Sequence, residues 1–533
     1  MNMNLYGFGP PEARKWIMLD CGVTFGAETD TPGIDVIMPD PAFIAERRRD
    51  LLGIVLTHGH EDHLGAVAYL WPQLRCPVYA TPFTAALLRG KLEEEDLIDE
   101  VKLRIIPLGA KFELGPFALE LITLTHSIPE PNAVAITTPL GRVLHTGDWK
   151  IDPDPLIGDV TDEAALRRLG EEGVLAMVCD STNALVEGES GSEASVRESL
   201  VHLIGTLKNR IAVTAFASNL ARLESVVHAA HLHGRHVALV GRAMHRITAA
   251  ARETGFLDHF QPFIDLEAAA QLPRGKVLYL CTGSQGESGA ALSRIARDDF
   301  GGVTLEEGDA VVYSSRVIPG NEKSIFAVQN ALAAKGVQLI TDRDHFIHVS
   351  GHPCRHELTK MYQWVRPQIA IPVHGEMRHM TEHARLAKEL QVPESILAPN
   401  GSLVRLAPGA PGVVDEVPSG RLYRDGILMT GNADAAVKAR KSLSFAGFVG
   451  VTAILDRKAR LAFDPVIHAE GIPEVVVKRF SAAIELAMDR LTKRQRDDDA
   501  ELIETVRRAV RKEANDAWGK RPVTKVELVW LEE

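Results

Sequence analysis

The chain has 533 residues, of which 45% are hydrophobic and 24% are charged. A chain of this length exceeds what one hydrophobic core usually serves, so we expect about three domains. The net charge of −12 argues only weakly against a polyanionic partner, because bound metal ions add positive charge locally. No apolar run is long enough to span a membrane, and no signal peptide is recognisable at the N-terminus.

The cysteines show no disulfide framework and no metal-site spacing. Five are scattered along the chain, at Cys21, Cys76, Cys179, Cys281 and Cys354. Several lie in apolar, strand-like runs, which indicates buried free thiols in a reducing compartment. Histidine, aspartate and glutamate therefore remain as the metal ligands to look for.

The first informative element is an apolar run over residues 16–20 that ends in Asp20. It predicts a strand with a carboxylate at its C-terminal end. This carboxylate is a candidate hydrogen-bond partner for a metal-ligating histidine, at the ring nitrogen that does not bind the metal. A turn-capping aspartate explains it equally well. Residues 23–50 are rich in Gly and Pro and predict loops.

The next element is the centre of the sequence. Residues 51–56 form an apolar run of strand length, and residues 64–71 read as a buried helix. Four ligand-type side chains lie between them, at His58, His60, Asp62 and His63. Imidazole and carboxylate together suit zinc, or manganese where oxygen ligands dominate. A surface loop that happens to be rich in histidine is less favoured, because chance rarely sets four ligands directly after a buried strand.

Further along the chain, ligand-type residues recur at the ends of predicted strands. Residues 76–80 predict a strand, a helix follows from Pro82 to about Leu92, and residues 93–100 predict an acidic surface segment. The alternating run over residues 117–126 ends in His126, and the strand over residues 141–148 ends in Asp148. In layered α/β folds, sites assemble outside the carboxyl ends of the strands.

The same arrangement recurs three more times. Residues 174–179 lead into Asp180-Ser181-Thr182, residues 345–347 into His348-Val349-Ser350-Gly351-His352, and residues 369–373 into His374-Gly375-Glu376. The strongest ligand candidates are seven: His58, His60, Asp62, His63, His126, Asp148 and His374. They suffice for two metal ions, with Asp148 as the natural bridge because a carboxylate can use both oxygens.

Between about residues 190 and 345 the pattern changes to strands alternating with helices. The predicted strands cover residues 211–216, 236–240, 276–281, 310–313 and 337–340. This alternation predicts βαβ units and a parallel sheet, and its position between Asp148 and His374 predicts an inserted domain. Small polar residues follow several strands, at Ser218-Asn219, residues 282–287 and residues 314–316. They suit phosphate binding before helix N-termini, although a Gly-rich turn alone is weak evidence.

The last part of the chain predicts a small α/β module. Residues 401–435 read as short strands, turns and a linker; a strand follows at residues 450–455, helices at about 473–496 and 500–518, and a closing strand at 523–530. We therefore expect a first metal-binding part at residues 1–190, the insertion at 191–347, the return and linker at 348–435, and a C-terminal domain at 445–533. The size of the last domain suggests a role in assembly or partner contact.

The motif His58-x-His60-x-Asp62-His63, with His126, Asp148 and His374, resembles the metallo-β-lactamase superfamily. The segments at Asp180, His348–His352 and His374, flanking an inserted α/β block, are similar to the β-CASP nucleases of that superfamily. The full layout, including the C-terminal module, resembles the bacterial ribonuclease J family. The resemblance covers essentially the whole chain. It implies an α/β fold: a metallo-β-lactamase αββα sandwich with an inserted β-CASP domain and a small C-terminal α/β domain.

The resemblance also implies roles for individual residues. One metal would be held by His58, His60 and His126, the other by Asp62, His63 and His374, with Asp148 bridging. The cofactor would be two Zn²⁺ ions per subunit, with Mn²⁺ or Mg²⁺ able to support activity. Residues that would bind substrate are His348, Val349, Ser350, Gly351 and His352, together with Ala217, Ser218 and Asn219.

By the same resemblance the protein would be a cytoplasmic ribonuclease of RNA decay and of rRNA and mRNA processing. It would act as a 5′-to-3′ exonuclease that prefers 5′-monophosphorylated RNA, with endonuclease activity as well. It would form a homodimer or homotetramer and contact RNA-degradation partners. The family usually opens with a strand and a Gly-Gly-x-x-Glu-Ile-Gly-type turn, whereas this chain begins at Met1-Asn2. We expect that edge strand to be missing, with more effect on stability than on metal ligation.

The ligand set indicates hydrolysis of a phosphodiester by hydroxide that two metal ions activate. A leaving 3′-oxygen needs a proton, and His352 is a slightly better candidate for this than His348, with Asp180 to orient it. Asp62 is the fourth candidate catalytic residue. Hydroxide attack does not need the RNA 2′-OH, so RNA preference must come from contacts around the cleft.

Two other classes of function fit part of the sequence. One is a small-ester or lactam hydrolase of the same fold, which would need neither the inserted block nor the His-x-Ser-Gly-His segment. The other is a catalytically silent RNA-binding scaffold, which would not need all seven ligands. Turnover of a thioester or lactam would favour the first, and RNA binding without turnover would favour the second.

Overall fold

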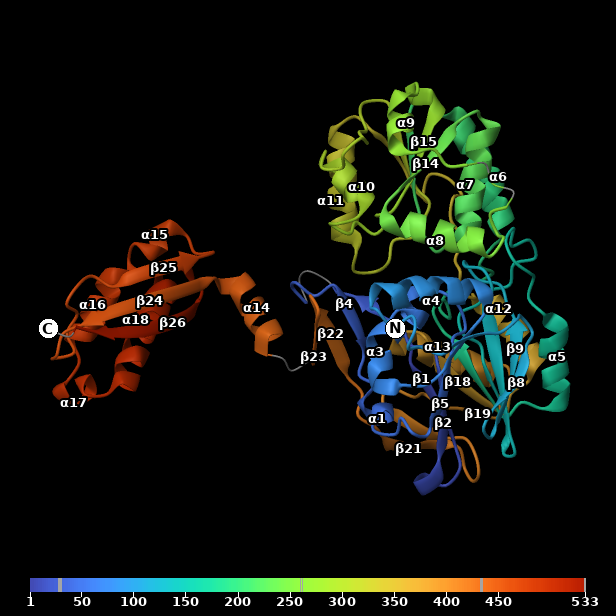
Figure 1. The fold of residues 1–533 in the computed structure, drawn as a ribbon, viewed down its shortest axis with the longest axis horizontal. Helices are drawn as coiled ribbons and strands as arrows, with labels where there is room; N and C mark the ends of the chain where they lie inside the picture. Colours follow the sequence, from blue (N-terminus) through green and yellow to red (C-terminus); the bar gives the residue numbers. More distant parts are fainter. Residues whose placement is uncertain (27–30, 259, 261, 432–434, 532–533) are drawn as a thin grey trace. The chain divides into compact units, whose positions relative to one another are not determined.

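The computed structural model describes residues 1–26, 31–258, 260, 262–431 and 435–531, so residues 432–434 of the predicted linker lie outside it. By backbone contacts the chain divides into two compact units. The first comprises Met1–Thr24 and Met38–Ser419, and the second Phe25–Ile37 and Gly420–Glu533. Each unit is described separately (Figure 1).

The first unit contains two sheets that face each other. The smaller sheet has the order β1 (Asn4–Phe8), β2 (Lys15–Leu19), β5 (Leu51–Val55), β6 (Val78–Ala80) and β7 (Leu103–Ile105). The larger has the order β19 (Glu394–Ser395), β18 (Ile369–Val373), β12 (Ala176–Asp180), β11 (Gly141–His145), β10 (Asn132–Thr138), β9 (Phe117–Thr123) and β8 (Lys111–Leu114). β1 pairs antiparallel with β2 and forms one edge of the smaller sheet.

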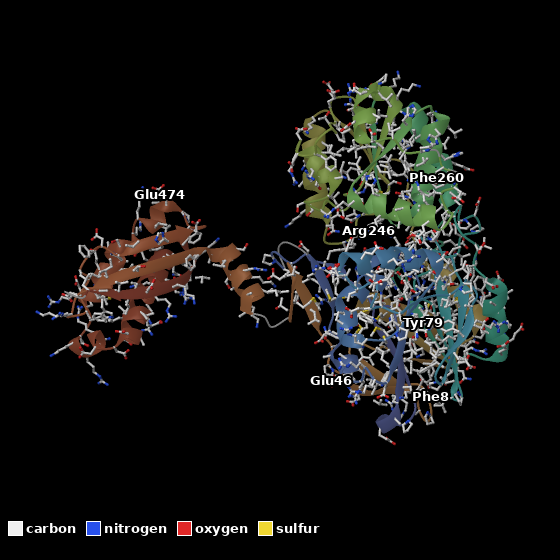
Figure 2. All side chains as sticks on the ribbon, viewed as in Figure 1. Phe8, Glu46, Tyr79, Arg246, Phe260 and Glu474 are labelled. Carbon is white, nitrogen blue, oxygen red and sulfur yellow. The ribbon has the colours of Figure 1, made fainter. Side chains whose placement is uncertain are left out.

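A buried apolar layer joins the two sheets. It includes Ile17, Leu19 and Val55 from the smaller sheet and Leu119, Leu121, Val134, Ile136, Val143, Val178 and Ile371 from the larger. Tyr79, which is labelled in Figure 2, lies at the border of this layer. Its ring stacks on that of Phe112, with centroids 5.4 Å apart. Alternate residues of each strand point into the layer, as the period of two in a strand requires.

Helices cover the outer faces of both sheets. On the smaller sheet lie α1 (Ala42–Ala45), α2 (Glu61–Leu64), α3 (Val67–Leu74) and α4 (Pro82–Glu94). On the larger lie α5 (Glu163–Glu172), α12 (Arg355–Val365) and α13 (Met377–Glu389), which share a second apolar core with Leu144 and Met177. The arrangement is the αββα sandwich expected from the sequence. A two-stranded ladder, β20 (Ser402–Arg405) and β21 (Gly412–Glu416), follows.

The helix predicted over residues 64–71 corresponds to α3, which begins three residues later, and the separate short helix α2 precedes it. The backbone N–H of Ala66 donates to the carbonyl of Cys21, and the N–H of Val23 donates to the carbonyl of Glu61. Because these groups bond to the segment after β2, the helical hydrogen bonds do not continue from α2 into α3. The short α2 can therefore present Asp62 and His63 toward the end of the sheet.

Between β12 and β18 the chain forms the inserted α/β domain. Its five strands have the order β14 (His236–Val240), β15 (Val277–Cys281), β13 (Ile211–Thr214), β16 (Ala310–Tyr313) and β17 (Gln338–Ile340). Every neighbouring pair is parallel, which agrees with the βαβ units expected from the sequence. Its helices are α6 (Glu193–Thr206), α7 (Leu220–Leu232), α8 (Arg242–Glu253), α9 (Leu266–Gln271), α10 (Ala291–Ala296) and α11 (Glu322–Ala334), drawn green to yellow in Figure 1.

The second unit has a four-stranded sheet in the order β23 (Leu428–Gly431), β22 (Arg421–Asp425), β4 (Val36–Pro39) and β3 (Thr24–Phe25). After α14 (Ala435–Ala446) comes a sheet in the order β25 (Val466–Glu470), β24 (Phe448–Leu455) and β26 (Val523–Trp530). Its helices are α15 (Glu474–Val477), α16 (Phe480–Asp489), α17 (Lys493–Arg496) and α18 (Asp499–Trp518), and α16 and α18 share an apolar core with β24. The predicted helix over residues 473–496 is thus three shorter helices.

Candidate metal centre

The ligand-type residues gather at one edge of the two sheets. His58 and His60 follow β5, His126 follows β9, Asp148 follows β11, and His374 follows β18. β11, β12 and β18 are parallel, and β9 runs in the same direction because β10 is antiparallel to both β9 and β11. Their carboxyl ends therefore meet on one side, where a site is expected.

The first ligand set consists of His58, His60, His126 and Asp148. Nδ1 of His60 lies 3.1 Å from Nε2 of His58 and 3.1 Å from Nε2 of His126. Nε2 of His126 lies 3.9 Å from Oδ2 of Asp148. One N–H of His60 could serve only one of its two imidazole neighbours, so mutual hydrogen bonding does not satisfy these three nitrogens.

The second ligand set consists of Asp62, His63, Asp148 and His374. Oδ2 of Asp148 lies 3.1 Å from Nε2 of His63 and 3.4 Å from Nε2 of His374. Oδ2 of Asp62 lies 3.5 Å and 3.1 Å from the same two nitrogens. Asp148 belongs to both sets, and its Oδ1 is buried with no hydrogen-bond partner among the described residues.

These residues fit zinc. In each set the ligand atoms lie within 4.8 Å of one another. Zinc–ligand bonds of about 2.0–2.1 Å in tetrahedral geometry place neighbouring ligand atoms about 3.3 Å apart, close to most of the separations above. The buried, unpartnered Oδ1 of Asp148 is an acceptor that a cation could use in addition to Oδ2. A third set, Asp148, Asp180, His352 and His374, overlaps the second and gives a further place for a cation or a proton.

The protonation states also fit a cation. Burial lowers the pKa of His58 and His126, and lowers that of His60 to about 4. All three imidazoles are therefore neutral near pH 7, and each can offer a nitrogen lone pair to a metal ion. Burial opposes ionisation of Asp148, but His374 and His63 outweigh it and hold the pKa of Asp148 well below its usual range. The pKa of His63 is raised to about 10, because Asp148 and Asp62 outweigh the effect of burial. A metal ion would replace that proton, which is how metal binding is linked to pH.

A network around Asp20 orients His63 and His58. Nδ1 of His63 donates to Oδ2 of Asp20 over 2.7 Å, which leaves Nε2 of His63 to face Asp148. Thr57 donates to Asp20 twice, from its backbone N–H over 2.8 Å and from its hydroxyl over 2.9 Å. The Thr57 hydroxyl accepts from Nδ1 of His58 over 2.9 Å. Of the two sequence interpretations of Asp20, the structure thus supports the ligand-orienting one.

Two further histidines are oriented in the same way. Nδ1 of His126 donates to the carbonyl of Gly351 over 2.5 Å. Nδ1 of His374 donates to the hydroxyl of Thr182 over 2.9 Å, and this hydroxyl donates to Oδ1 of Asp180 over 2.7 Å. Outer hydrogen bonds of this kind fix the tautomer of a ligating imidazole and direct its other nitrogen to the metal.

Close backbone approach explains two glycines at the site. A Cβ on Gly351 would lie 2.8 Å from the imidazole of His126, so a side chain there would displace the histidine. A Cβ on Gly22 would lie 1.8 Å from the carbonyl oxygen of Asp62. Asp20 and His374 have left-handed backbone, with φ of 63° and 54°. Such strain costs on the order of 1–3 kcal/mol and persists where the surroundings fix it, as the hydrogen bonds of both side chains do here.

Of the two proton-donor candidates, His352 has the better geometry. Its Nδ1 donates to Oδ2 of Asp180 over 2.7 Å and lies 3.9 Å from Oδ2 of Asp148. Burial lowers the pKa of His352, but Asp180 outweighs burial and the net shift is upward. His348 belongs to none of the three ligand sets, and burial and nearby cations lower its pKa to about 3.

The predicted substrate-binding segments lie at strand ends of the inserted domain and beside the ligands. Ser350 accepts from the amide of Asn183 over 2.8 Å, and Val349 is buried. Ala217 and Ser218 are half-buried after β13. Asn219 is the N-cap of α7: its side chain accepts from the backbone of Arg222 and donates to Glu193, so its amide is already engaged.

The sequence reasoning missed three residues that support the site. Asn183 holds the His348–His352 segment through Ser350 and the carbonyl of His352. Arg222, fully buried, donates to the carbonyl of Ile347 and pairs with Glu193. Asn2 donates to the carbonyl of Asp62 over 3.0 Å and lies 3.0 Å from Nε2 of His63. Of these three, only Arg222 could have been identified from the sequence, because an arginine is unusual within an apolar helical run.

Replacing Asp20 by asparagine is expected to weaken zinc binding about 10- to 100-fold. Asparagine tolerates left-handed backbone, so the turn is kept while the negative charge that faces His63 is lost. Competition against a fluorescent chelator measures the affinity, with Asp50→Asn on the surface as the matched control. Equal affinity of the wild type and the Asp20 variant would contradict this role.

The fold and the ligand sets define a metallo-hydrolase of the metallo-β-lactamase type. In agreement, residues 12–179 match the metallo-beta-lactamase superfamily, and residues 336–399 match the Zn-dependent metallo-hydrolase RNA specificity domain. Residues 208–332 match the ribonuclease J beta-CASP domain, and residues 435–529 match the ribonuclease J C-terminal domain. The chain belongs to the ribonuclease J family.

Individual relatives extend over nearly the whole chain. Ribonuclease J of Sinorhizobium meliloti is 47% identical over 532 residues, covering 99% of this chain and 94% of the relative. Ribonuclease J of Corynebacterium glutamicum is 38% identical and covers 98% of this chain and 73% of the relative. That of Thermus thermophilus is 36% identical and covers 85% and 79%.

A solved structure shares the fold. A protein of unknown function from Enterococcus faecalis V583 aligns with a TM-score of 0.50 at 16% identity, covering 74% of this chain and 94% of that one. At this identity the likeness concerns the fold alone. Among the described residues, no helix is both long and apolar enough to cross a membrane.

Proposed function

We propose that this protein is a metal-dependent ribonuclease that hydrolyses phosphodiesters at two Zn²⁺ ions per subunit. The observation that carries the proposal is the pair of ligand sets that share Asp148, in a chain whose inserted and C-terminal domains both match ribonuclease J. His58, His60 and His126 would hold one ion, and Asp62, His63 and His374 the other, with Asp148 between them. Mn²⁺ or Mg²⁺ would support activity in place of zinc.

When bound, two such ions supply hydroxide near neutral pH and stabilise the charge that develops on the phosphate. The remaining work falls to the protein. Asp20, Thr57, Thr182 and the carbonyl of Gly351 hold four of the five ligating imidazoles, those of His63, His58, His374 and His126, in one tautomer. This arrangement is complete before substrate arrives, so reorganisation contributes little to the barrier.

His352 would protonate the departing 3′-oxygen. Its Nδ1 is fixed by Asp180, so Nε2 is the atom that exchanges the proton with substrate. Asp180 is fully buried and also accepts from Thr182, so it orients His352 and stabilises the imidazolium. Asp62 would act by ligating metal and His348 by contacting substrate.

We further propose 5′-to-3′ exonuclease activity with a preference for 5′-monophosphorylated RNA, together with endonuclease activity. Residues 348–352 and 217–219 would contact the substrate, through backbone groups at Asn219 because its side chain is engaged. The protein would act in the cytoplasm, as a homodimer or homotetramer, in RNA decay and processing alongside RNA-degradation partners. The metal-binding domain would comprise residues 1–190 and 348–435, the inserted domain residues 191–347, and the C-terminal domain residues 445–533.

The test uses one RNA in two forms, with a 5′-monophosphate and with a 5′-triphosphate, each labelled at the 5′ end. The wild type is expected to release labelled mononucleotide from the monophosphate form and much less from the triphosphate form. An Asp62→Ala, His63→Ala variant should release none from either. Resistance of both forms to the wild type with zinc or manganese present would refute the ribonuclease proposal.

A small-ester or lactam hydrolase is the second reading of the same fold. It leaves unexplained why the chain has an inserted parallel-sheet domain of five strands and a segment that matches an RNA specificity domain. A chromogenic lactam and a thioester, assayed beside the RNA, separate the two readings.

A further inference from the structure

Two segments of the C-terminal module carry basic residues and no acidic ones. Residues 435–455 contain Lys438, Arg440 and Lys441 without any Asp or Glu. Residues 517–526 contain Lys520, Arg521 and Lys525, again without a carboxylate. Such runs stand out in a chain whose net charge is −12. Neither run has a role in the metal centre.

The fold brings these two segments together although they are far apart in sequence. Nζ of Lys520 donates to the carbonyl of Phe445 over 2.9 Å, and the N–H of Val523 donates to the carbonyl of Gly447 over 3.0 Å. The end of α14 and the start of β26 are thereby joined. We use the name basic patch for the exposed or half-exposed side chains of these two joined segments, Lys441, Phe445, Lys520, Arg521 and Lys525.

An exposed aromatic ring lies within the basic patch. Phe445 is 69% exposed, and Nζ of Lys520 lies 4.6 Å from its ring centroid and 4.9 Å from that of Trp518. A cation against an aromatic face is held in place by attraction to the π-electrons. The open face of Phe445 remains available to a planar group such as a nucleobase.

The cations of the patch have a carboxylate nearby, since Glu527 lies two residues from Lys525 on β26, but among the described residues they are not paired with one. On the open face of the sheet, Lys525 lies opposite Gly450, which has no side chain to cover it. The nearest carboxylates by register are Glu470 and Glu527, on β25 and β26. Within the described part of the chain, Lys441, Lys520, Arg521 and Lys525 make no ion pair with a carboxylate. Arg440, in contrast, pairs with Asp425 over 2.7 Å.

The balance of charge sets the module apart from the rest of the chain. Residues 435–533 contain 19 Lys and Arg against 16 Asp and Glu, whereas residues 1–434 contain 40 against 55. The module therefore carries a small net positive charge, which favours contact with a polyanion.

We propose that the basic patch binds single-stranded RNA, with its cations on successive phosphates and Phe445 stacked on a base. Grooves that hold single strands without sequence preference combine these two elements. This proposal rests on the proposed function, and it assigns to the C-terminal module a substrate-binding surface separate from the metal centre. An acidic protein would use the cations but would leave the exposed ring without a stacking partner.

The test compares two charge-reversal variants of the full chain. The patch variant is Lys441→Glu, Arg521→Glu and Lys525→Glu. The control is Lys493→Glu, Arg494→Glu and Lys512→Glu, which changes the net charge equally at exposed positions of the same module. Binding of a fluorescent, long single-stranded oligouridine is measured by anisotropy over a range of salt concentrations, with EDTA present to prevent cleavage.

The patch variant is expected to bind at least about tenfold more weakly than the wild type. The slope of log Kd against the logarithm of the salt concentration should fall by about 2, because three phosphate contacts are removed and each contributes about 0.7 on a single strand. Phe445→Ala should weaken binding about tenfold with the slope unchanged, because stacking releases no counterions. The control variant should match the wild type in both quantities.

Two results would overturn the inference. One is equal loss of affinity in the patch and control variants, which would mean that only net charge matters. The other is an unchanged salt slope together with a changed mass by light scattering, which would make the patch a contact between copies of the chain. Cleavage of a short oligonucleotide by the wild type tests the ribonuclease proposal separately. RNA binding by the patch can thus be refuted while cleavage is observed, or be supported while cleavage is absent.

Discussion

An Asp148→Asn variant is expected to lose about three orders of magnitude or more in kcat for RNA cleavage and to retain less than the wild-type amount of zinc. Oδ2 of Asp148 lies within 3.1–3.9 Å of ligand nitrogens from both sets, at His63, His374 and His126. An amide keeps the size of the carboxylate but has no negative charge and one acceptor oxygen instead of two. The variant therefore cannot bridge two cations.

Elemental analysis of the purified protein and single-turnover cleavage of a labelled RNA measure the two effects. Asp162→Asn is the matched control: Asp162 caps α5 on the surface, and asparagine caps a helix equally well. The control should keep both metal and activity. Wild-type zinc content and rate in the Asp148 variant would rule out a shared bridging carboxylate.

A His352→Ala variant is expected to keep its metal and to lose about 10²- to 10⁴-fold in kcat on RNA, the usual contribution of a general acid. The loss should shrink to a few-fold on a nitrophenyl phosphodiester, because a nitrophenolate leaves without needing a proton. Asp180→Asn should show the same pattern in weaker form, since Asp180 orients His352 through the 2.7 Å bond to Nδ1.

The pattern across substrates separates this role from a structural one. A residue that merely supports the fold or a metal would slow both substrates alike. Equal losses on RNA and on the nitrophenyl ester, or loss of zinc from the His352 variant, would assign His352 to the overlapping third ligand set instead.

The strands that carry the ligands were predictable because each combines an apolar run with a polar residue at its end. β5, β9, β11, β12 and β18 all follow this pattern, and the structure brings their ends together. β10 is not predicted by this pattern, although it lies inside the larger sheet between β11 and β9. Its sequence, Asn132-Ala-Val-Ala-Ile-Thr-Thr138, is short in large apolar residues and begins with a buried asparagine.

Helix ends were the weaker part of the prediction. The run over residues 473–496 is interrupted before α17, where Thr492 and Gln495 form a capping box. That pattern was visible in the sequence and marks a new helix start. The break between α2 and α3, in contrast, depends on bonds from Ala66 and Val23 across the loop after β2, which no local pattern reports.

The supporting residues of the site depend on tertiary contacts as well. Asn183 and Asn2 are small polar residues whose neighbours in sequence give no hint of Ser350 or His63 as partners. Asn219 shows the opposite case: it looked like a ligand-binding residue at a strand end, but it caps α7 and holds Glu193. The type of residue and its spacing predicted metal ligands better than they predicted substrate contacts.

Water, and not the RNA 2′-OH, is expected to attack the phosphodiester at this site. The most direct test is cleavage, in ¹⁸O-labelled water, of a 5′-monophosphorylated RNA with a single 2′-deoxynucleotide at the scissile position. Cleavage is expected at a rate close to that of the all-ribose strand, with one ¹⁸O in the new 5′-phosphate and a free 3′-OH on the released nucleotide. A block at the deoxynucleotide, or a 2′,3′-cyclic phosphate product, would contradict attack by water.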